Sequence, residues 1–169
     1  MRAKVNQHNK KVLRKNETNR ITENEKECSC PRNAICPMDG KCLEKDILYT
    51  AELTCNLANY GTKVYKGICS TTWKDRFNNH TKSFNNIAYK NESELSKEVW
   101  KIKNNGGNCE IKWRKERKSA SYQPERKKCN LCATEKVAIA TSQSALLNKK
   151  NEIVSRCRHR FKFKLKNCK

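Results

Sequence analysis

The chain of 169 residues is poor in the apolar residues that fill the core of an ordinary globular domain, and in the glycine and proline that form its turns. It contains only 5 glycines and 3 prolines, and its apolar residues make up 36%, below the roughly 45–50% of an average domain. Acidic residues are also scarce, with 17 Asp and Glu against 38 Lys and Arg, so that the net charge is +21. This composition predicts one small core in a chain of single-domain length.

Long hydrophobic runs are missing as well. The first 26 residues contain no apolar segment of the signal-peptide type, and no run approaches the roughly 18 apolar residues of a membrane span. We therefore expect an intracellular protein with no membrane partner. Thiols stay reduced in such a compartment, so the 11 cysteines need an explanation other than disulfides.

The best-known motifs of nucleotide chemistry and hydrolysis are absent too. The sequence has no Gly-rich phosphate loop of the Walker or Rossmann type and no visible Ser-His-Asp arrangement. It also shows no internal repeat and no low-complexity tract. No small-molecule cofactor is expected.

Positive charge, in contrast, is abundant and runs along the whole chain. A net charge of +21 opposes compaction and favours a polyanionic partner. The spread of Lys and Arg is typical of a protein that contacts the phosphate backbone of DNA without reading its sequence. The alternative is a surface that is basic but merely soluble.

Local patterns predict a small α+β or α/β layer preceded by a solvated arm at 1–26. Alternation of apolar residues indicates strands at 46–53, 62–69 and 109–114, and a basic edge strand in the tail at 158–169. Spacings of three and four indicate helices at 70–80, 91–103, 129–142 and 146–157, with Asn91 or Ser93 capping the second. The segment 115–128 is expected to be a basic loop, and Asn59 with Gly61 suits a hairpin-like connection.

Four cysteines crowd into the stretch CSCPRNAICPMDGKC, with the spacing C-x-C-x5-C-x5-C. Four thiolates close a tetrahedral zinc shell, and the prolines together with Asp39 and Gly40 supply the tight turns that wrapping a metal requires. A segment this poor in apolar residues usually needs a metal or a bridge. We predict structural zinc, with disulfides and unliganded thiols as the alternatives. The expected ligands are Cys28, Cys30, Cys36 and Cys42.

A second set of ligands is spread over the C-terminal part of the chain. Cys129-x-x-Cys132 and Cys157-x-His159 form two pairs that together resemble a Cys3His zinc site clamping two helices. The alternative is that Cys132 and Cys157 are small buried hydrophobic residues. Cys55, Cys69 and Cys109 fall in or near expected strands, where core packing explains them.

One further constellation suits phosphodiester chemistry. Arg76 and His80 share a helix face at i,i+4 spacing. Arg can stabilise charge on a phosphate, and Tyr or His can act as a base. A single carboxylate can hold Mg2+ that keeps most of its waters. The candidate residues are Tyr49, Tyr65, Arg76, His80, Glu135 and Asn148.

The order of these residues resembles the GIY-YIG nuclease family. ILY at 47–49 stands where the family has its first signature, and VYKG at 64–67 where it has its second. Arg76 and His80 match the first helix of the family, Glu135 its metal-binding Glu, and Asn148 its late Asn. The likeness is closest to the endonuclease of Penelope-like retroelements, across about residues 27–167, where a cysteine cluster also precedes the first strand. The departures are Asp46 before ILY without the first-signature Gly, and Lys66 for the central Ile.

The resemblance implies a GIY-YIG-type domain at 46–169, with a central three-stranded antiparallel sheet flanked by helices, behind a zinc-binding cysteine cluster at 27–45. It implies a DNA endonuclease of the nucleus that uses Mg2+ or Mn2+ and works with a reverse transcriptase in cis or in trans. Glu135 would bind the catalytic metal, and Tyr49 would be the general base, positioned by Tyr65 and His80. Arg76 would stabilise the phosphate and Asn148 would fix the geometry. Gly67 would let the substrate backbone approach.

Two other functions compete with this one. The first is a catalytically inactive, zinc-stabilised DNA-binding relic of a retroelement, which would keep the fold and the charge. The second is a secreted, disulfide-bonded basic protein, against which the odd cysteine count and the missing signal peptide argue.

Trp73, Phe84 and Tyr89 could stack on bases, although core packing explains most aromatic residues.

Overall fold

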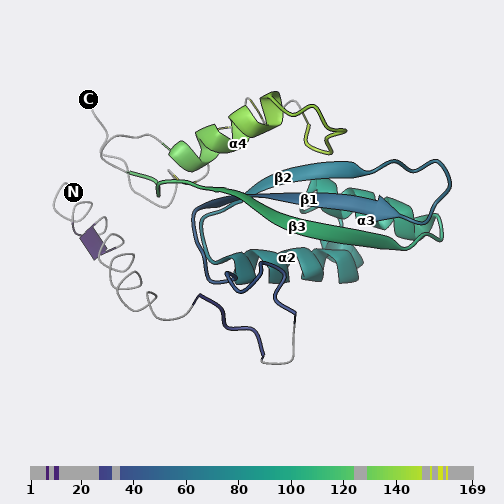
Figure 1. Ribbon diagram of the computed structural model, residues 1–169, viewed down its shortest axis with the longest axis horizontal. Coiled ribbons are helices and arrows are strands. Elements are labelled where there is room, and N and C mark those ends of the chain that lie inside the picture. The colour runs from purple at the N-terminus through teal and green to yellow at the C-terminus, as the bar shows by residue number, and fades with distance from the viewer. Residues whose placement is uncertain are drawn as a thin grey trace.

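A three-stranded antiparallel sheet forms the centre of the molecule in the computed structural model (Figure 1). The structure describes residues 7, 10, 11, 27–31, 35–123, 129–149, 153, 156, 157 and 159. Strand β1 (Ile47–Cys55) lies in the middle, between β2 (Lys63–Cys69) and β3 (Cys109–Lys118). The expected α+β class with a three-stranded antiparallel sheet is confirmed.

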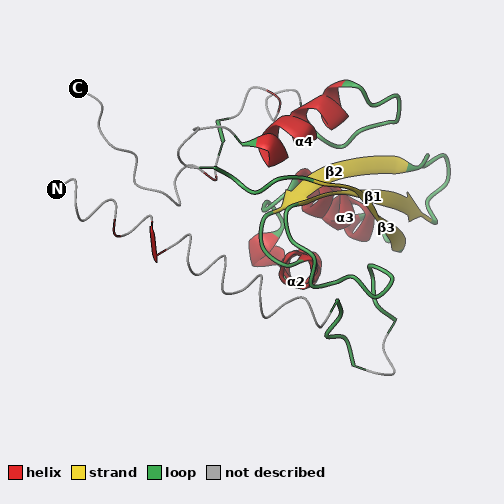
Figure 2. Ribbon diagram, turned by 60° about the vertical axis from the view of Figure 1, so that its left-hand side comes forward, coloured by secondary structure: helices red, strands yellow, loops and turns green. Residues whose placement is uncertain are grey.

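Helices cover both faces of this sheet. Helices α2 (Trp73–Asn85) and α3 (Glu94–Asn104) lie on one side, joined by the short 3-10 helix η1 (Ile87–Tyr89), and α4 (Asn130–Ala140) lies on the other side (Figure 1, Figure 2). No helix in the described ranges has the length and hydropathy needed to cross a membrane.

The helices begin where side chains can replace missing backbone partners. The hydroxyl of Thr72 accepts from the backbone N–H of Asp75, and the hydroxyl of Ser93 accepts from that of Ser96. Cys129 caps α4 in the same way through its sulfur. Such caps typically contribute about 1 kcal/mol for Ser and Thr. The Ser93 alternative for the α3 cap is therefore confirmed.

The main core lies between the sheet and helices α2 and α3. Alternation along β1 turns Ile47, Tyr49 and Leu53 toward this side, and all three are fully buried. Trp73 opens α2 and is also fully buried, so it is not available for stacking on a base. Cys69 belongs to the core, and Cys55 and Cys109 pack partly buried against it, as expected.

Two predicted segments differ from the structure. The basic loop expected at 115–128 is wrong at its start, because β3 continues to Lys118 and pairs with β1 as far as Ile47. The helix expected at 146–157 is wrong over 146–149, where the chain is extended and Leu146 bridges Val64 in parallel. Pairing satisfies the outer edge of β2, which a helix could not do.

Several predictions fall on other parts of the chain. The arm at 1–26, apart from residues 7, 10 and 11, lies outside the described residues, as do most of 150–158 and the expected edge strand from 160 onward.

Candidate metal centres and candidate active site

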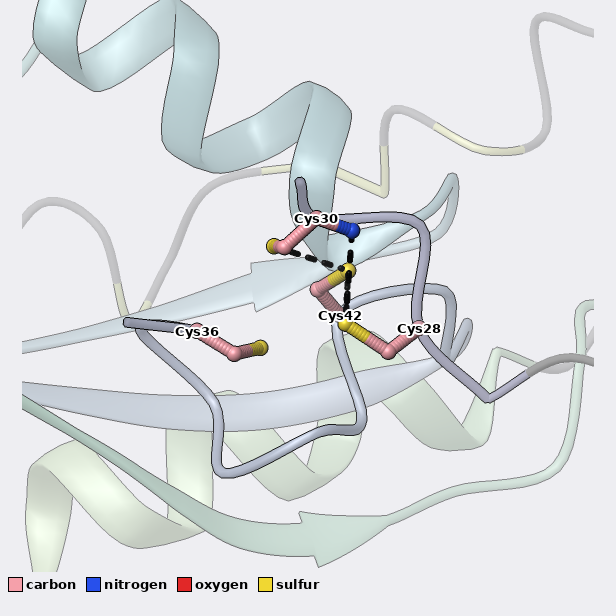
Figure 3. A group of neighbouring side chains, drawn as sticks. All are labelled: Cys28, Cys30, Cys36 and Cys42. Carbon is pink, nitrogen blue, oxygen red and sulfur yellow. Dashed lines mark hydrogen bonds between the residues drawn. The ribbon is translucent and has the colours of Figure 1, made fainter. Parts of the chain in front are cut away.

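The first cysteine cluster converges into a compact four-sulfur site. The sulfur atoms of Cys28, Cys30, Cys36 and Cys42 all lie within 4.8 Å of one another (Figure 3). The Cys42 sulfur is 3.5 Å from that of Cys28 and 3.7 Å from that of Cys30. A tetrahedral shell with Zn–S bonds of about 2.3 Å requires sulfur–sulfur separations of roughly 3.8 Å. The site therefore fits zinc, and every described cysteine is a free thiol.

The loop between these cysteines turns tightly, as predicted. Asp39 and Gly40 have φ angles of 47° and 85°, and the N–H of Lys41 donates to the carbonyl of Met38 at 2.9 Å. Backbone N–H groups also point at the sulfurs, since the N–H of Cys30 donates to the Cys28 sulfur at 3.4 Å. This hydrogen bond, followed by the one from Cys42, lowers the pKa of the Cys28 thiol to about 7, whereas the hydrogen bond with Cys42, followed by burial, raises the pKa of Cys30 to about 12. The thiolate that a metal needs therefore forms most readily at Cys28.

This first cluster is built onto the main core and onto the start of α2. Cys42 and Met38 are buried in the core, against which Cys28, Cys30 and Cys36 pack. The backbone N–H of Lys74 donates to the carbonyl of Cys42 at 2.7 Å, and its ammonium donates to the carbonyl of Ser29 at 2.9 Å. The cluster thus holds the first turn of the helix that carries Arg76 and His80.

The second cluster joins the start of α4 to residues 157 and 159. The ligand atoms of Cys129, Cys132, Cys157 and His159 lie within 4.8 Å of one another. Nδ1 of His159 is 3.2 Å from the sulfurs of Cys129 and Cys132, and the sulfurs of Cys132 and Cys157 are 3.5 Å apart. These separations fit a tetrahedral Cys3His zinc shell in which His159 ligates through Nδ1. All four residues are partly exposed.

A hydrogen-bonded cluster of Tyr49, Arg76 and His80 lies under the sheet between β1 and α2. Nε of Arg76 donates to the hydroxyl of Tyr49 at 2.9 Å, and this hydroxyl lies 2.7 Å from Nε2 of His80. Burial, and then the charge of Arg76, lower the pKa of His80 to about 3. The imidazole is therefore neutral, and the direction of its hydrogen bond with the Tyr49 hydroxyl is set by which ring nitrogen carries the hydrogen.

The burial of Tyr49 decides its protonation. The residue is fully buried, and this burial raises the pKa of its phenol more strongly than Arg76 lowers it. Tyr65 lies beside it, with ring centroids 6.5 Å apart, and is 7% exposed. Tyr49 is thus a neutral hydroxyl that accepts from Arg76 and is hydrogen-bonded to His80.

Gly67 provides the space that the Tyr49 hydroxyl occupies. It pairs with Tyr49 across β1 and β2, and a Cβ at this position would come within 2.5 Å of the Tyr49 hydroxyl oxygen. Tyr49 itself therefore excludes any side chain at position 67, which explains why a glycine stands there. The sequence alone did not reveal this reason.

Asn148 binds the backbone of β2. Its side-chain oxygen accepts from the N–H of Lys66 at 2.8 Å, and its Nδ2 donates to the carbonyl of Lys66, also at 2.8 Å. The amide thereby continues the parallel pairing that begins with Val64 and Leu147. In this structure Asn148 fixes the edge strand that carries Tyr65 and Gly67.

Glu135 lies partly exposed in α4, which packs on β2 and β1 across the face opposite to α2. A single, partly exposed carboxylate suits Mg2+, an ion that keeps several waters and uses few protein ligands.

The sequence did not suggest the ionic network on the α4 face. The Glu116 carboxylate accepts from Lys66 Nζ at 2.5 Å and from the Thr50 hydroxyl. These three residues meet through the register of the three strands, which no local pattern reveals.

The chain matches no protein-family model, no curated protein sequence and no solved structure. The sheet, its flanking helices and the two ligand clusters are compatible with the resemblance drawn from the sequence.

Proposed function

We propose that this protein is a metal-dependent DNA endonuclease of the GIY-YIG type, stabilised by two structural zinc ions. The observation that carries the proposal is the hydrogen-bonded cluster of Tyr49, Arg76 and His80, whose members stand at the positions of the family's signature residues. A net charge of +21 supports DNA as the substrate.

The chemistry would divide among these residues as follows. Arg76, with Nε engaged by Tyr49, would direct its remaining N–H groups at the scissile phosphate. Tyr49, buried and with its hydroxyl engaged by both side chains, would position Arg76 and His80 rather than contact the attacking water itself. Glu135 would hold Mg2+ or Mn2+, which supplies Lewis-acid charge and a more acidic water. Asn148 and Gly67 would position β2 and Tyr49.

The nicked product would carry a 3′ hydroxyl suited to priming a reverse transcriptase, in cis or in trans. This partner, and the nuclear location, rest on the likeness to retroelement nucleases.

The second candidate function is a zinc-stabilised DNA-binding module without catalysis. The complete burial of Tyr49 and its raised pKa favour it, because a base must reach water and lose a proton.

Relaxation of supercoiled plasmid separates these two functions. Purified, zinc-loaded protein is incubated with Mg2+ or Mn2+ beside Glu135→Ala and Tyr49→Phe. We expect nicking that needs the divalent cation and is lost in both variants. DNA binding without nicking by the folded wild type would establish the non-catalytic module instead.

A further inference from the structure

A pocket opens beside Arg76 and His80, between α2, η1 and the start of α3. Its volume is about 260 Å³, slightly below the roughly 300–1,000 Å³ of sites for drug-sized ligands. It therefore suits one small group rather than an extended molecule. The lining residues with groups available to a ligand are Arg76, Asn79, Lys82, Tyr89 and Glu92.

The floor of this pocket is preformed. The hydroxyl of Ser83 is buried, donates to the carbonyl of His80 at 2.8 Å and lies 2.5 Å from the hydroxyl of Ser96. Ser93 lines the pocket as the cap of α3, accepting from the N–H of Ser96 at 3.1 Å. Because these hydroxyls already have partners, they shape the pocket rather than read its ligand.

The rim, in contrast, offers groups that await a partner. Asn79 and Glu92 are exposed, and their side chains make no hydrogen bond or ion pair with another described residue. The partly exposed ring of Tyr89 carries the Lys82 ammonium 4.1 Å from its centroid. A stacking ring, an amide, a carboxylate and two cations thus surround one small space. This is the chemistry that recognises an unstacked base next to its phosphate.

We infer that the pocket receives one unpaired nucleotide adjacent to the phosphate that Arg76 contacts. The inference deepens the proposed nuclease function and rests on it, because the pocket shares Arg76 and His80 with the candidate active site. A base inside an intact duplex cannot enter a concave pocket, so the preferred substrate is DNA with an extruded or unpaired base. The Glu92 carboxylate can only accept hydrogen bonds, which favours a base with an exocyclic amine (adenine, cytosine or guanine) over thymine.

A fluorescent base tests this inference through binding alone. Duplexes carrying 2-aminopurine, either bulged or paired, are titrated with the full chain in the absence of Mg2+ and Mn2+. Stacking quenches 2-aminopurine, and anisotropy at fixed salt gives the two dissociation constants. We expect the wild type to bind the bulged duplex about tenfold more tightly, as one base–aromatic contact allows. Quenching should occur in the bulged duplex alone.

Three variants distinguish the pocket from general charge. Tyr89→Ala should remove the preference while leaving the affinity for paired DNA unchanged, and Tyr89→Phe should retain it. Tyr60→Ala is the matched control, since Tyr60 also has a lysine over its ring, with Lys63 Nζ at 4.6 Å, but lies outside the pocket. Zinc content and a thermal melt confirm that each variant is folded.

Equal affinity of the wild type for both duplexes would overturn the inference. So would an equal loss of both affinities in Tyr89→Ala. A preference for bulged DNA in a protein that never nicks would keep the pocket and reject the nuclease. Nicking of plasmid by a protein that has no preference for bulged DNA would keep the nuclease and reject the pocket.

Discussion

The two faces of the sheet are built on different principles. The face under α2 and α3 holds the large apolar core, in which Trp73, Leu95 and Ile102 are almost completely buried. The face under α4 carries Lys66, Glu116 and Thr50, joined by polar contacts, and only Leu131 and Ile139 of α4 are buried. Each face has its own ligand cluster. A zinc ion would therefore bind beside a large apolar core on one face and beside a more polar, less buried layer on the other.

Because of this difference, we expect the two zinc ions to stabilise different parts of the structure. The Cys28–Cys42 cluster adds to a core that already buries many side chains, and it holds the start of α2 through backbone hydrogen bonds. The Cys129–His159 cluster joins residues 157 and 159 to α4, whose buried side chains are Leu131 and Ile139. Loss of the first zinc should disturb Arg76 and His80 through the start of α2, whereas loss of the second should release α4 and with it Glu135.

The largest expected effect comes from removing one ligand of each cluster. Cys42→Ala should lower the number of bound zinc ions from two to one and lower Tm by at least about 10 °C, because zinc binding contributes strongly to folding and Cys42 is also buried in the core. Cys132→Ala should also lose one zinc but melt the main core at nearly the wild-type temperature. Native mass spectrometry gives the zinc content, and near-UV circular dichroism follows the core tryptophans.

Cys55→Ala is the control for a cysteine outside both clusters and should keep two zinc ions. If Cys132→Ala lowered the melting temperature of the core as much as Cys42→Ala does, the contrast between the faces would be wrong.

Gly67→Ala tests the packing on the α2 face. The new methyl group would meet the Tyr49 hydroxyl oxygen at 2.5 Å, so we expect the free energy of unfolding to fall by about 1–3 kcal/mol, as for other overpacked sites. Urea denaturation measures the change. Gly61→Ala is the matched control, because nothing lies within 4 Å of its Cβ and its φ is not in the left-handed region. A loss of stability equal in the two variants would show that Tyr49 does not fill this space.

Asn148→Ala tests the α4 face, where side-chain hydrogen bonds hold the edge of β2. Two hydrogen bonds to the Lys66 backbone disappear, and we expect the free energy of unfolding to fall by about 1–2 kcal/mol. Hydrogen exchange should become faster at Lys66 but not in β3. Unchanged protection at Lys66 would mean that the amide does not hold this strand.

The smallest effect is a pH dependence from His80. Its pKa in the folded protein is lowered to about 3, chiefly by burial. The unfolded chain therefore binds a proton below pH 6.5 that the folded chain does not, so stability falls as pH decreases from 6.5 toward 3. Between pH 7 and 5.5 this contribution is about 1 kcal/mol.

The measurement is urea denaturation across that range for the wild type and His80→Gln. Acid weakens zinc binding in both proteins, so the difference between the two slopes reports His80. Identical slopes would mean that the pKa of His80 is the same in the folded and the unfolded chain.

Much of the architecture was predictable because the relevant forces act over short stretches. Alternation in β1, the Ser93 cap and the cysteine spacings each depend on neighbours along the chain. The helix expected at 146–157 failed at its start because the edge of β2 offered Leu146 and Asn148 partners that local periodicity does not show. The Lys66–Glu116 pair was missed for the same reason, since it depends on strand register.

Spacing and composition are properties of the chain, and they were enough to identify the two ligand sets, the basic charge and the order of the three strands with α2, α3 and α4. The folded molecule was needed to learn that Tyr49 is buried and neutral, that Gly67 makes room for its hydroxyl, and that a pocket lies beside Arg76. Protonation and free space depend on which distant segments exclude water from a side chain, and that is settled when the sheet and its helices pack together.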